Sequence, residues 1–344
     1  MNQLIKDSGF TFAVAELEHP HIFDMARELV EAGARLKCFH ERDGAKAAAF
    51  QKMFPQAEAA PSVEAILRDN EIRLVAAAGV PSERAELGIR VMEHGKDYFV
   101  DKTAFTDLKQ LEAVKKSVAK TGRKFIVYLS GQFTKSVKRA KLIIDGGEIG
   151  RVVNVISLGP HRLNEPSRPA WFFDKKRYGG ILCDIGSHQI AEFLYFADAG
   201  DARVISSRVG NYANPRRPEL EDFGDASLVA DNGATSYFKV DWLTPDGLRA
   251  WGDDRTIITG TKGFIEIRKN LDLGVDSEPA PGKIFVVNGE REYVCDAGDG
   301  EYPERLEELL LDFINGTENA ISQDFIFKVG ELCIIAQEIA VTCS

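Results

Sequence analysis

Residues 10–40 read FTFAVAELEHPHIFDMARELVEAGARLKCFH, and they decide the fold of the first half of the chain. The apolar run at 10–15 predicts a buried strand, and the apolar residues of 21–33 recur at helical spacing before a glycine stop. A second apolar run at 35–40 predicts the next strand. A strand, a helix and another strand in this order are typical of a parallel sheet.

The same alternation continues to residue 129. Helices are predicted at 44–53, 63–68, 81–94 and 106–121, and strands at 72–77, 97–100 and 124–129. Regular alternation of this kind predicts a doubly wound parallel sheet with right-handed crossovers. We therefore expect a dinucleotide-binding Rossmann domain over residues 1–129.

The pattern changes after residue 129. A helix is predicted at 135–145, strands at 151–158, 203–212, 227–230, 234–242, 255–259, 263–268, 284–287 and 292–294, and closing helices at 303–315 and 324–341. Clustered strands with few crossovers indicate an α+β domain with an open, mainly antiparallel sheet. The fold class is therefore α/β, with this second domain at 130–344, and the last helix can pack back on the first domain.

Composition limits the partners. The chain has 344 residues, 44% hydrophobic and 28% charged, as expected of a globular protein. Its net charge of −10 argues against a nucleic-acid surface. No stretch approaches the roughly 18–20 apolar residues that cross a membrane. The five cysteines are scattered, which predicts neither a disulfide framework nor a metal site. We expect a cytoplasmic protein.

A candidate site for chemistry lies in residues 178–196. Two glycines open this stretch, and Asp184 and His188 follow, four residues apart at the start of an apolar helix. That spacing places both side chains on one helix face, where a carboxylate can orient an imidazole for general acid/base catalysis. The alternative is that Asp184 caps the helix and His188 is an ordinary, partly buried histidine.

The cofactor is expected at the carboxyl ends of the first strands. An acidic residue that holds the ribose falls about 20 residues after the phosphate loop, and Glu41 lies at that place. A carboxylate there favours NAD because it repels a 2′-phosphate, while the adjacent Arg42 leaves NADP open. The alternative is that Glu41 is only a surface turn residue.

The phosphate loop departs from the glycine pattern. Glu16, Glu18 and His21 occupy the three positions where glycines normally let backbone amides approach the phosphates. Each close carboxylate–phosphate pair would cost about 1–4 kcal/mol unless the side chain turns away or is neutralised. Either cofactor binding is weakened, or the pyrophosphate is held by His19, His21 and the helix end.

Four stretches together resemble the Gfo/Idh/MocA oxidoreductases. These are Gly-Lys-Asp-Tyr-Phe-Val-Asp-Lys-Thr at 95–103, Gly-Glu-Ile-Gly-Arg-Val at 147–152, Asp-Ile-Gly-Ser-His at 184–188 and Gly-Thr-Lys-Gly-Phe-Ile-Glu at 260–266. They are similar to the family's EKP segment, domain-crossing turn, DxGxH motif and late strand pair. The resemblance covers nearly the full length.

The resemblance implies roles for individual residues. Lys102 would reach the reacting hydroxyl and the nicotinamide ribose, and Asp184 and His188 would complete the catalytic group, with His188 as proton acceptor. The implied cofactor-binding set is Glu16, Leu17, His19, His21, Ile22, Glu41, Arg42, Ala78, Pro81, Asp101 and Lys102. Besides the phosphate loop, two positions depart from the family: Thr103 replaces a proline that is often cis, and Ala191 replaces a further acid.

Substrate-binding candidates lie before residues 178–196 and within them. They are Ser130, Gln132, His161, Arg162, Trp171 and Tyr178, together with Asp184 and His188. Trp171 and Tyr178 would stack on a sugar face, whereas His161 and Arg162 would bind hydroxyls or a carboxylate. The alternative is that the two aromatic residues belong to the core.

The resemblance implies an NAD(P)-dependent dehydrogenase or reductase acting on a sugar, cyclitol or related polyol. It also implies a homodimer or homotetramer formed through the second sheet. Two alternatives stay open: a non-catalytic ligand-binding or regulatory homologue with weakened cofactor binding, and a redox-neutral, glycosidase-like enzyme that uses tightly held NAD.

Overall fold

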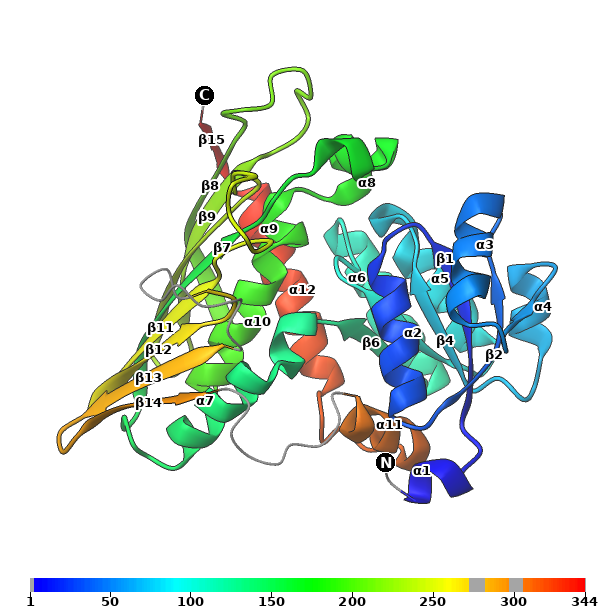
Figure 1. The fold of residues 1–344 in the computed structure, drawn as a ribbon, viewed down its shortest axis with the longest axis horizontal. Coiled ribbons are helices and arrows are strands. Elements are labelled where there is room, and N and C mark those ends of the chain that lie inside the picture. Colours follow the sequence, from blue (N-terminus) through cyan, green and yellow to red (C-terminus); the bar gives the residue numbers. More distant parts are fainter. Residues whose placement is uncertain (1–2, 272–281, 297–305, 344) are drawn as a thin grey trace. The chain divides into compact units, whose positions relative to one another are not determined.

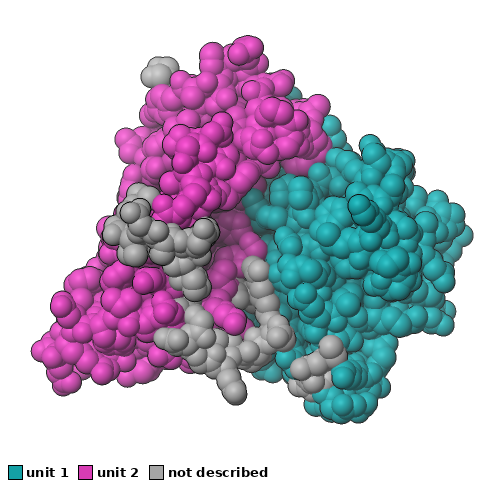
Figure 2. Space-filling view, viewed as in Figure 1, with its two compact units in different colours: residues 1–128, 176–179, 302–330 teal, residues 129–175, 180–301, 331–344 magenta. Residues whose placement is uncertain are grey.

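The computed structural model describes residues 3–271, 282–296 and 306–343, without the side chains of Gln132 and Phe133. The chain forms two compact units, coloured separately in Figure 2. Unit 1 comprises Met1–Tyr128, Lys176–Gly179 and Tyr302–Gly330. Unit 2 comprises Leu129–Lys175, Gly180–Glu301 and Glu331–Ser344.

Unit 1 contains a six-stranded parallel sheet in the order β3-β2-β1-β4-β5-β6 (Figure 1). Its strands are β1 (Thr11–Leu17), β2 (Arg35–His40), β3 (Glu58–Ala59), β4 (Leu74–Ala78), β5 (Asp97–Asp101) and β6 (Phe125–Tyr128). The strand order reverses beside β1, which is the topological switch point of a doubly wound sheet. The predicted Rossmann fold is confirmed.

Some helices of unit 1 begin or end at capping residues that the sequence provides. They are α1 (Gln3–Asp7), α2 (His21–Glu31), α3 (Gly44–Met53), α4 (Val63–Arg68), α5 (Pro81–Glu93), α6 (Leu108–Thr121) and α11 (Glu307–Asn315). Asp43 and Asp107 accept backbone N–H groups at the starts of α3 and α6. Gly122 ends α6 at φ 64°, a left-handed conformation that glycine adopts without strain.

Unit 2 contains a nine-stranded sheet in the order β14-β13-β12-β11-β7-β10-β9-β8-β15. The pairs β7–β10 and β8–β15 are parallel and the others are antiparallel, so the predicted, mainly antiparallel sheet is confirmed. Its strands are β7 (Val152–Pro160), β8 (Ala202–Gly210), β9 (Phe223–Ala230), β10 (Thr235–Asp241), β11 (Arg255–Gly260), β12 (Gly263–Arg268), β13 (Lys283–Asn288), β14 (Glu292–Asp296) and β15 (Val341–Cys343).

Helices α7 (Lys135–Asp145) and α10 (Gly186–Ala197) pack on one face of this sheet. α10 is apolar over most of its surface, and eight of its residues from Gln189 to Ala197 are buried. Further short helices are α8 (Lys175–Tyr178) and α9 (Ile181–Asp184). No helix in the described ranges is both long and apolar enough to cross a membrane.

The end of the chain differs from the prediction. Helix α12 (Gln323–Glu338) stops before Val341, and residues Val341–Cys343 pair in parallel with β8 as strand β15. Apolar periodicity continues past the helix end, but the closing residues are rich in β-branched side chains that favour a strand. The sequence prediction of a helix to Val341 was therefore wrong at its end. Residues 303–305 of the other predicted closing helix lie outside the described residues.

Candidate functional site

The predicted cofactor residues of unit 1 gather at one edge of its sheet. Glu16 and Leu17 end β1, Ala78 ends β4 and Asp101 ends β5, while Glu41 directly follows β2. Carboxyl ends of parallel strands share an edge, so these residues surround the switch point. Ile22 is fully buried in the first turn of α2, Pro81 is the first residue of α5, and Arg42 is exposed.

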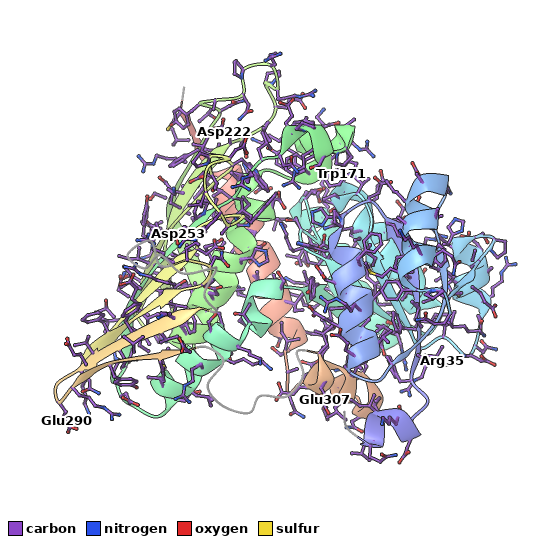
Figure 3. The ribbon with its side chains drawn as sticks, viewed as in Figure 1. Arg35, Trp171, Asp222, Asp253, Glu290 and Glu307 are labelled. Atoms are coloured by element: carbon purple, nitrogen blue, oxygen red, sulfur yellow. The ribbon has the colours of Figure 1, made fainter. Side chains whose placement is uncertain are left out.

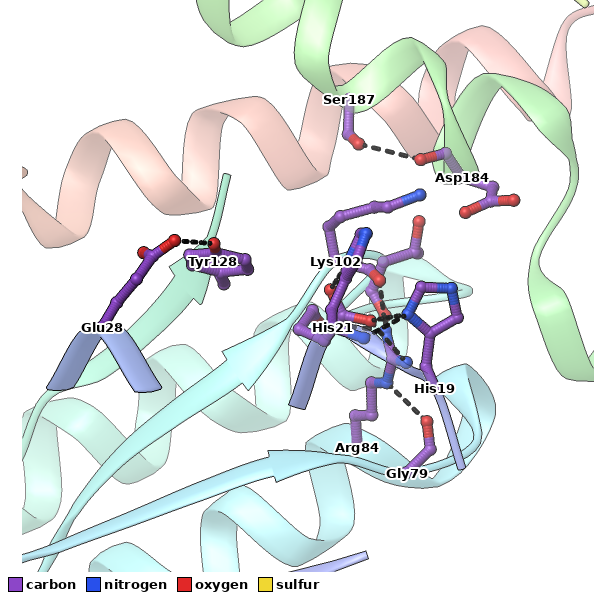
Figure 4. A network of polar contacts seen from close by, with 11 residues as sticks. His19, His21, Glu28, Gly79, Arg84, Lys102, Tyr128, Asp184 and Ser187 are labelled. Atoms are coloured by element: carbon purple, nitrogen blue, oxygen red, sulfur yellow. Dashed lines mark hydrogen bonds and ion pairs between the residues drawn. The ribbon is translucent and has the colours of Figure 1, made fainter. Parts of the chain in front are cut away.

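Asp101 is the centre of a buried polar network (Figure 4). Its carboxylate is fully buried and lies 3.1 Å from Nδ1 of His19, 2.8 Å from Nδ1 of His21 and 3.2 Å from Nη2 of Arg84. Burial raises the pKa of Asp101, but the charges of His21 and Arg84 and the hydrogen bond from His19 outweigh it and hold the pKa well below its usual range. Asp101 is therefore an ionised group held by three donors.

Arg84 fastens the backbone on both sides of Lys102. Its guanidinium donates to the carbonyls of Gly79 (2.7 Å), Asp101 (3.0 Å) and Thr103 (3.0 Å), and also to that of Lys102. The Lys102–Thr103 peptide bond is cis. Since Arg84 and Lys102 are both almost fully buried, the segment that carries the Lys102 side chain is rigidly placed.

Two histidines stand where a glycine loop would normally be. The His19 side chain is 17% exposed and that of His21 is 30% exposed. Burial lowers the pKa of His19 to about 4, with only partial compensation from Asp101, so the ring is neutral at neutral pH. Nδ1 of His19 faces the Asp101 carboxylate and also lies 3.4 Å from the backbone nitrogen of His21. Helix α2 begins at His21 without a side-chain cap from Pro20, and the first amides of the helix, those of Ile22 and Phe23, bond to the carbonyls of His19 (3.2 Å) and Pro20 (3.1 Å).

Glu16 keeps the backbone geometry of the glycine that it replaces. Its φ of 59° lies in the left-handed region. The side chain turns inward over Gly79, where an added Cβ would lie 1.9 Å from Oε2 of Glu16. Burial and then the charge of Glu83 raise the pKa of Glu16 to about 7. In the described part of the chain, Oε2 has no hydrogen-bond partner, and with a pKa of about 7 the carboxyl is about half protonated at neutral pH.

The other two carboxylates of this edge are engaged. Glu18 pairs with Lys46 at 2.7 Å, and Glu41 accepts the backbone N–H groups of Leu17 and Asp43, each at 2.8 Å. Glu16 turns inward and its raised pKa lowers its charge at neutral pH, so the repulsion expected between the loop and a pyrophosphate is reduced. The sequence showed that these residues carry carboxylates, but it did not show in which direction their side chains point.

In unit 2, Asp184 and His188 lie at a junction between two helices. Asp184 is the last residue of α9 and His188 lies in the first turn of α10. The backbone N–H of Asp184 bonds to Gly180 (3.0 Å), and that of His188 bonds to Ile185 (3.1 Å). Backbone hydrogen bonds therefore fix the residues on both sides of the junction, and the two side chains come from adjacent helical turns.

Glu192 is a buried acid that the sequence analysis missed. It is fully buried in α10 and accepts a hydrogen bond from Thr256 (3.2 Å) and an ion pair from Lys269. A Cβ on Gly131 would lie 3.2 Å from Oε1 of Glu192 and 3.5 Å from Nδ1 of His188, so one backbone segment contacts both residues. Its spacing of four residues from His188 was the available signal.

The predicted substrate residues fare unequally. Trp171 (labelled in Figure 3) and Tyr178 expose 6% and 1% of their surface, which favours core packing over the predicted stacking role. Arg162 donates to the carbonyls of Pro245 (3.2 Å) and Ala250 (3.1 Å), so it holds a loop rather than facing a ligand. The side chain of Gln132 lies outside the described residues.

A doubly wound sheet followed by a second sheet defines a two-domain Rossmann-type protein. Residues 12–129 match the description "Oxidoreductase family, NAD-binding Rossmann fold", and residues 137–266 match "GFO/IDH/MocA C-terminal domain". The chain belongs to the GFO/IDH/MocA oxidoreductase family. The resemblance seen in the sequence is confirmed.

Three relatives illustrate the family. A structure of a proposed oxidoreductase from Erwinia carotovora atroseptica is 46% identical, with a TM-score of 0.93 over 97% of this chain and 100% of that one. The scyllo-inositol 2-dehydrogenase (NAD(+)) of Bacillus subtilis is 28% identical over 59% of this chain, which spans only 57% of that curated relative. Levoglucosan dehydrogenase in complex with NADH and levoglucosan shares the fold, at 18% identity and a TM-score of 0.78 over 96% of this chain and 97% of that one.

Proposed function

We propose that the protein is an NAD(P)-dependent dehydrogenase or reductase that acts on a hydroxyl or carbonyl group of a sugar, cyclitol or related polyol. Family membership supports the reaction class, and two of the relatives, the scyllo-inositol 2-dehydrogenase and levoglucosan dehydrogenase, are named for compounds of this kind. The observation that carries the proposal is the inward-turned, near-neutral Glu16 at a retained left-handed turn. It leaves the switch point able to receive a dinucleotide despite the missing glycines.

The residues present fit such a cofactor. The N-terminus of α2 offers the positive end of its helix dipole to a pyrophosphate, and His19 and His21 stand beside it without adding negative charge. Glu41 retains acceptor capacity for ribose hydroxyls, because its two oxygens each accept only one backbone bond. This carboxylate favours NAD over NADP.

A bound nicotinamide would supply hydride acceptance and donation. The chain's own residues would handle the proton: His188 accepts it from the reacting hydroxyl during oxidation and returns it during reduction. Lys102 would hydrogen-bond the hydroxyl oxygen and lower the cost of removing its proton. Asp184 would stabilise the imidazolium form of His188. These roles follow the family resemblance.

The proposal is tested by substituting Lys102 and His188. Lys102→Ala and His188→Ala should each lower turnover about 10²- to 10⁴-fold, as expected for loss of a positioned acid/base group. Turnover is read at the reduced-nicotinamide band with a panel of polyols, sugars and sugar acids. Lys109→Ala and His94→Ala are matched controls, because both side chains are exposed. Full turnover in both site variants contradicts the assignment.

A further inference from the structure

Arg168 in unit 2 is a cation without an acidic partner. Its Nε donates to the carbonyl of Leu163 at 2.8 Å. Within the ranges that the structure describes, no carboxylate lies within 4.0 Å of its guanidinium. Aromatic rings lie close to that guanidinium instead. A partly buried arginine with unused donors is poised to bind an anion.

Three aromatic rings surround this guanidinium. Its central carbon lies 4.5 Å from the ring centre of Phe172, 4.8 Å from that of Trp242 and 5.6 Å from that of Trp251. We call these four residues the Arg168 cage. Cation–π contacts hold the guanidinium in place, and among the described residues its terminal N–H groups have no protein hydrogen-bond partner. Trp251 is 44% exposed, so one wall of the cage faces solvent.

The cage is positioned by a second arginine. Arg162 binds the carbonyls of Pro245, Leu248 and Ala250, and Trp251 directly follows that segment. The His161 ring also packs edge-on against Trp242, with ring centres 5.5 Å apart. The two arginines of this loop therefore differ: Arg162 donates to three carbonyls of one segment and lies 3.5 Å from Asp246, whereas Arg168 donates to the single carbonyl of Leu163.

The Arg168 cage is electrostatically linked to the proposed acid/base pair. Burial lowers the pKa of Arg168, and the charge of Asp184 acts in the opposite direction. Asp184 is the only charged group with a resolved effect on this guanidinium among the described residues. Asp184 is therefore near enough to Arg168 to act on its charge, and it lies four residues before His188.

We propose that Arg168 binds the carboxylate of a sugar acid, such as an aldonate or a uronate, and so sets the substrate class of this site. A planar carboxylate fits the guanidinium edge in a bidentate arrangement. The exposed face of Trp251 suits the C–H face of the attached polyol chain. As a substrate assignment this rests on the proposed function; binding of the anion does not require the cofactor.

Tryptophan fluorescence tests the proposal, because two of the chain's three tryptophans belong to the cage. The full chain is titrated with D-gluconate and with sorbitol, its neutral counterpart, then with D-galacturonate and D-galactose. At least one acid should bind about 10- to 100-fold more tightly than its neutral counterpart, as expected for a charge-assisted hydrogen-bonded pair. Arg168→Gln should abolish this preference, and Arg168→Lys should keep only part of it.

Controls separate binding from folding and from cofactor use. Arg216→Gln removes an exposed arginine and should leave every affinity unchanged. Thermal unfolding checks that each variant is folded. If Arg168→Gln does not fold, Arg168→Lys, which keeps the positive charge, tests the preference instead. Equal affinity for acids and neutral compounds, or a preference that survives in Arg168→Gln, overturns the proposal. Glucose 6-phosphate, titrated in the same way, is the phosphate probe. If its affinity depends on Arg168 and the affinity of neither sugar acid does, the proposal is also overturned.

NADH is titrated separately, by its own fluorescence. If NADH fails to bind while an Arg168-dependent preference for a sugar acid persists, the proposed dehydrogenase function fails and the carboxylate site stands. If NADH binds and no acid is preferred, the dehydrogenase proposal stands and the sugar-acid assignment is overturned.

Discussion

Two arginines, Arg84 fully buried and Arg168 partly buried, show how differently this molecule treats charge. Arg84 in unit 1 meets the Asp101 carboxylate and four backbone carbonyls, so its donors are used within the protein. Arg168 in unit 2 meets one carbonyl and three aromatic rings. A charge satisfied by its own chain fixes structure, whereas a charge left unsatisfied keeps binding energy for a ligand.

The largest expected effect is on the free energy of unfolding, which should respond differently to substitutions around Arg84 and at Arg168. Asp101→Asn leaves Arg84 buried without its counter-charge and should lower the free energy of unfolding by about 3–5 kcal/mol. Arg168→Gln breaks no ion pair and should change it by about 1 kcal/mol or less. Urea unfolding at neutral pH measures both. Asp24→Asn, which removes an exposed surface pair, is the control and should cost under about 1 kcal/mol. If Asp101→Asn and Arg168→Gln lowered the free energy of unfolding equally, the contrast between the two arginines would be wrong.

Glu16 gives a smaller effect with a defined dependence on pH. Its pKa is about 7 in the folded protein against 4.5 ordinarily, so between these values the native state binds more protons than the unfolded state. Stability should therefore fall as pH rises through this window, by about 1–3 kcal/mol. Glu16→Gln removes that fall and should be the more stable protein at pH 8, but not at pH 5.

Denaturation of both proteins at several pH values provides the measurement. His19, whose pKa is lowered to about 4, makes stability fall as pH drops below its ordinary value of 6.5, and it does so equally in both proteins. The difference between wild type and variant therefore isolates Glu16. Glu31→Gln, at an exposed position of α2, should show no such difference. If the difference in the free energy of unfolding between wild type and Glu16→Gln stayed constant from pH 5 to pH 8, Glu16 would be ionised throughout this range.

The smallest effect concerns cofactor choice. Glu41→Gln removes the negative charge at the end of β2 and should narrow any preference for NADH over NADPH about threefold to tenfold. Dissociation constants from nicotinamide fluorescence give the ratio. Glu58→Gln, at an exposed edge strand, should leave the ratio unchanged. An unaltered ratio in Glu41→Gln would place Glu41 among the turn residues and not among the ribose ligands.

Much of the fold follows from local sequence, because strand and helix periodicities in unit 1 agree with their burial. Glu16 shows where local reasoning stops. The residue type indicated repulsion, but the inward turn depends on the space above Gly79, which is distant in the sequence. Arg162 and Arg168 lie in the same loop, and only the carbonyls of the 245–250 segment decide which of them is satisfied. The ends of β15 and α12 depended likewise on pairing with β8.

Binding of the dinucleotide tests the central claim most directly. Calorimetry of the full chain with NADH and with NADPH, each raised to millimolar concentration, should give saturable binding of at least one of them, because Glu16 is near neutral and Glu18 is paired with Lys46. Absence of binding by both at millimolar concentration would contradict the account. It would leave a family member whose switch point no longer holds a cofactor.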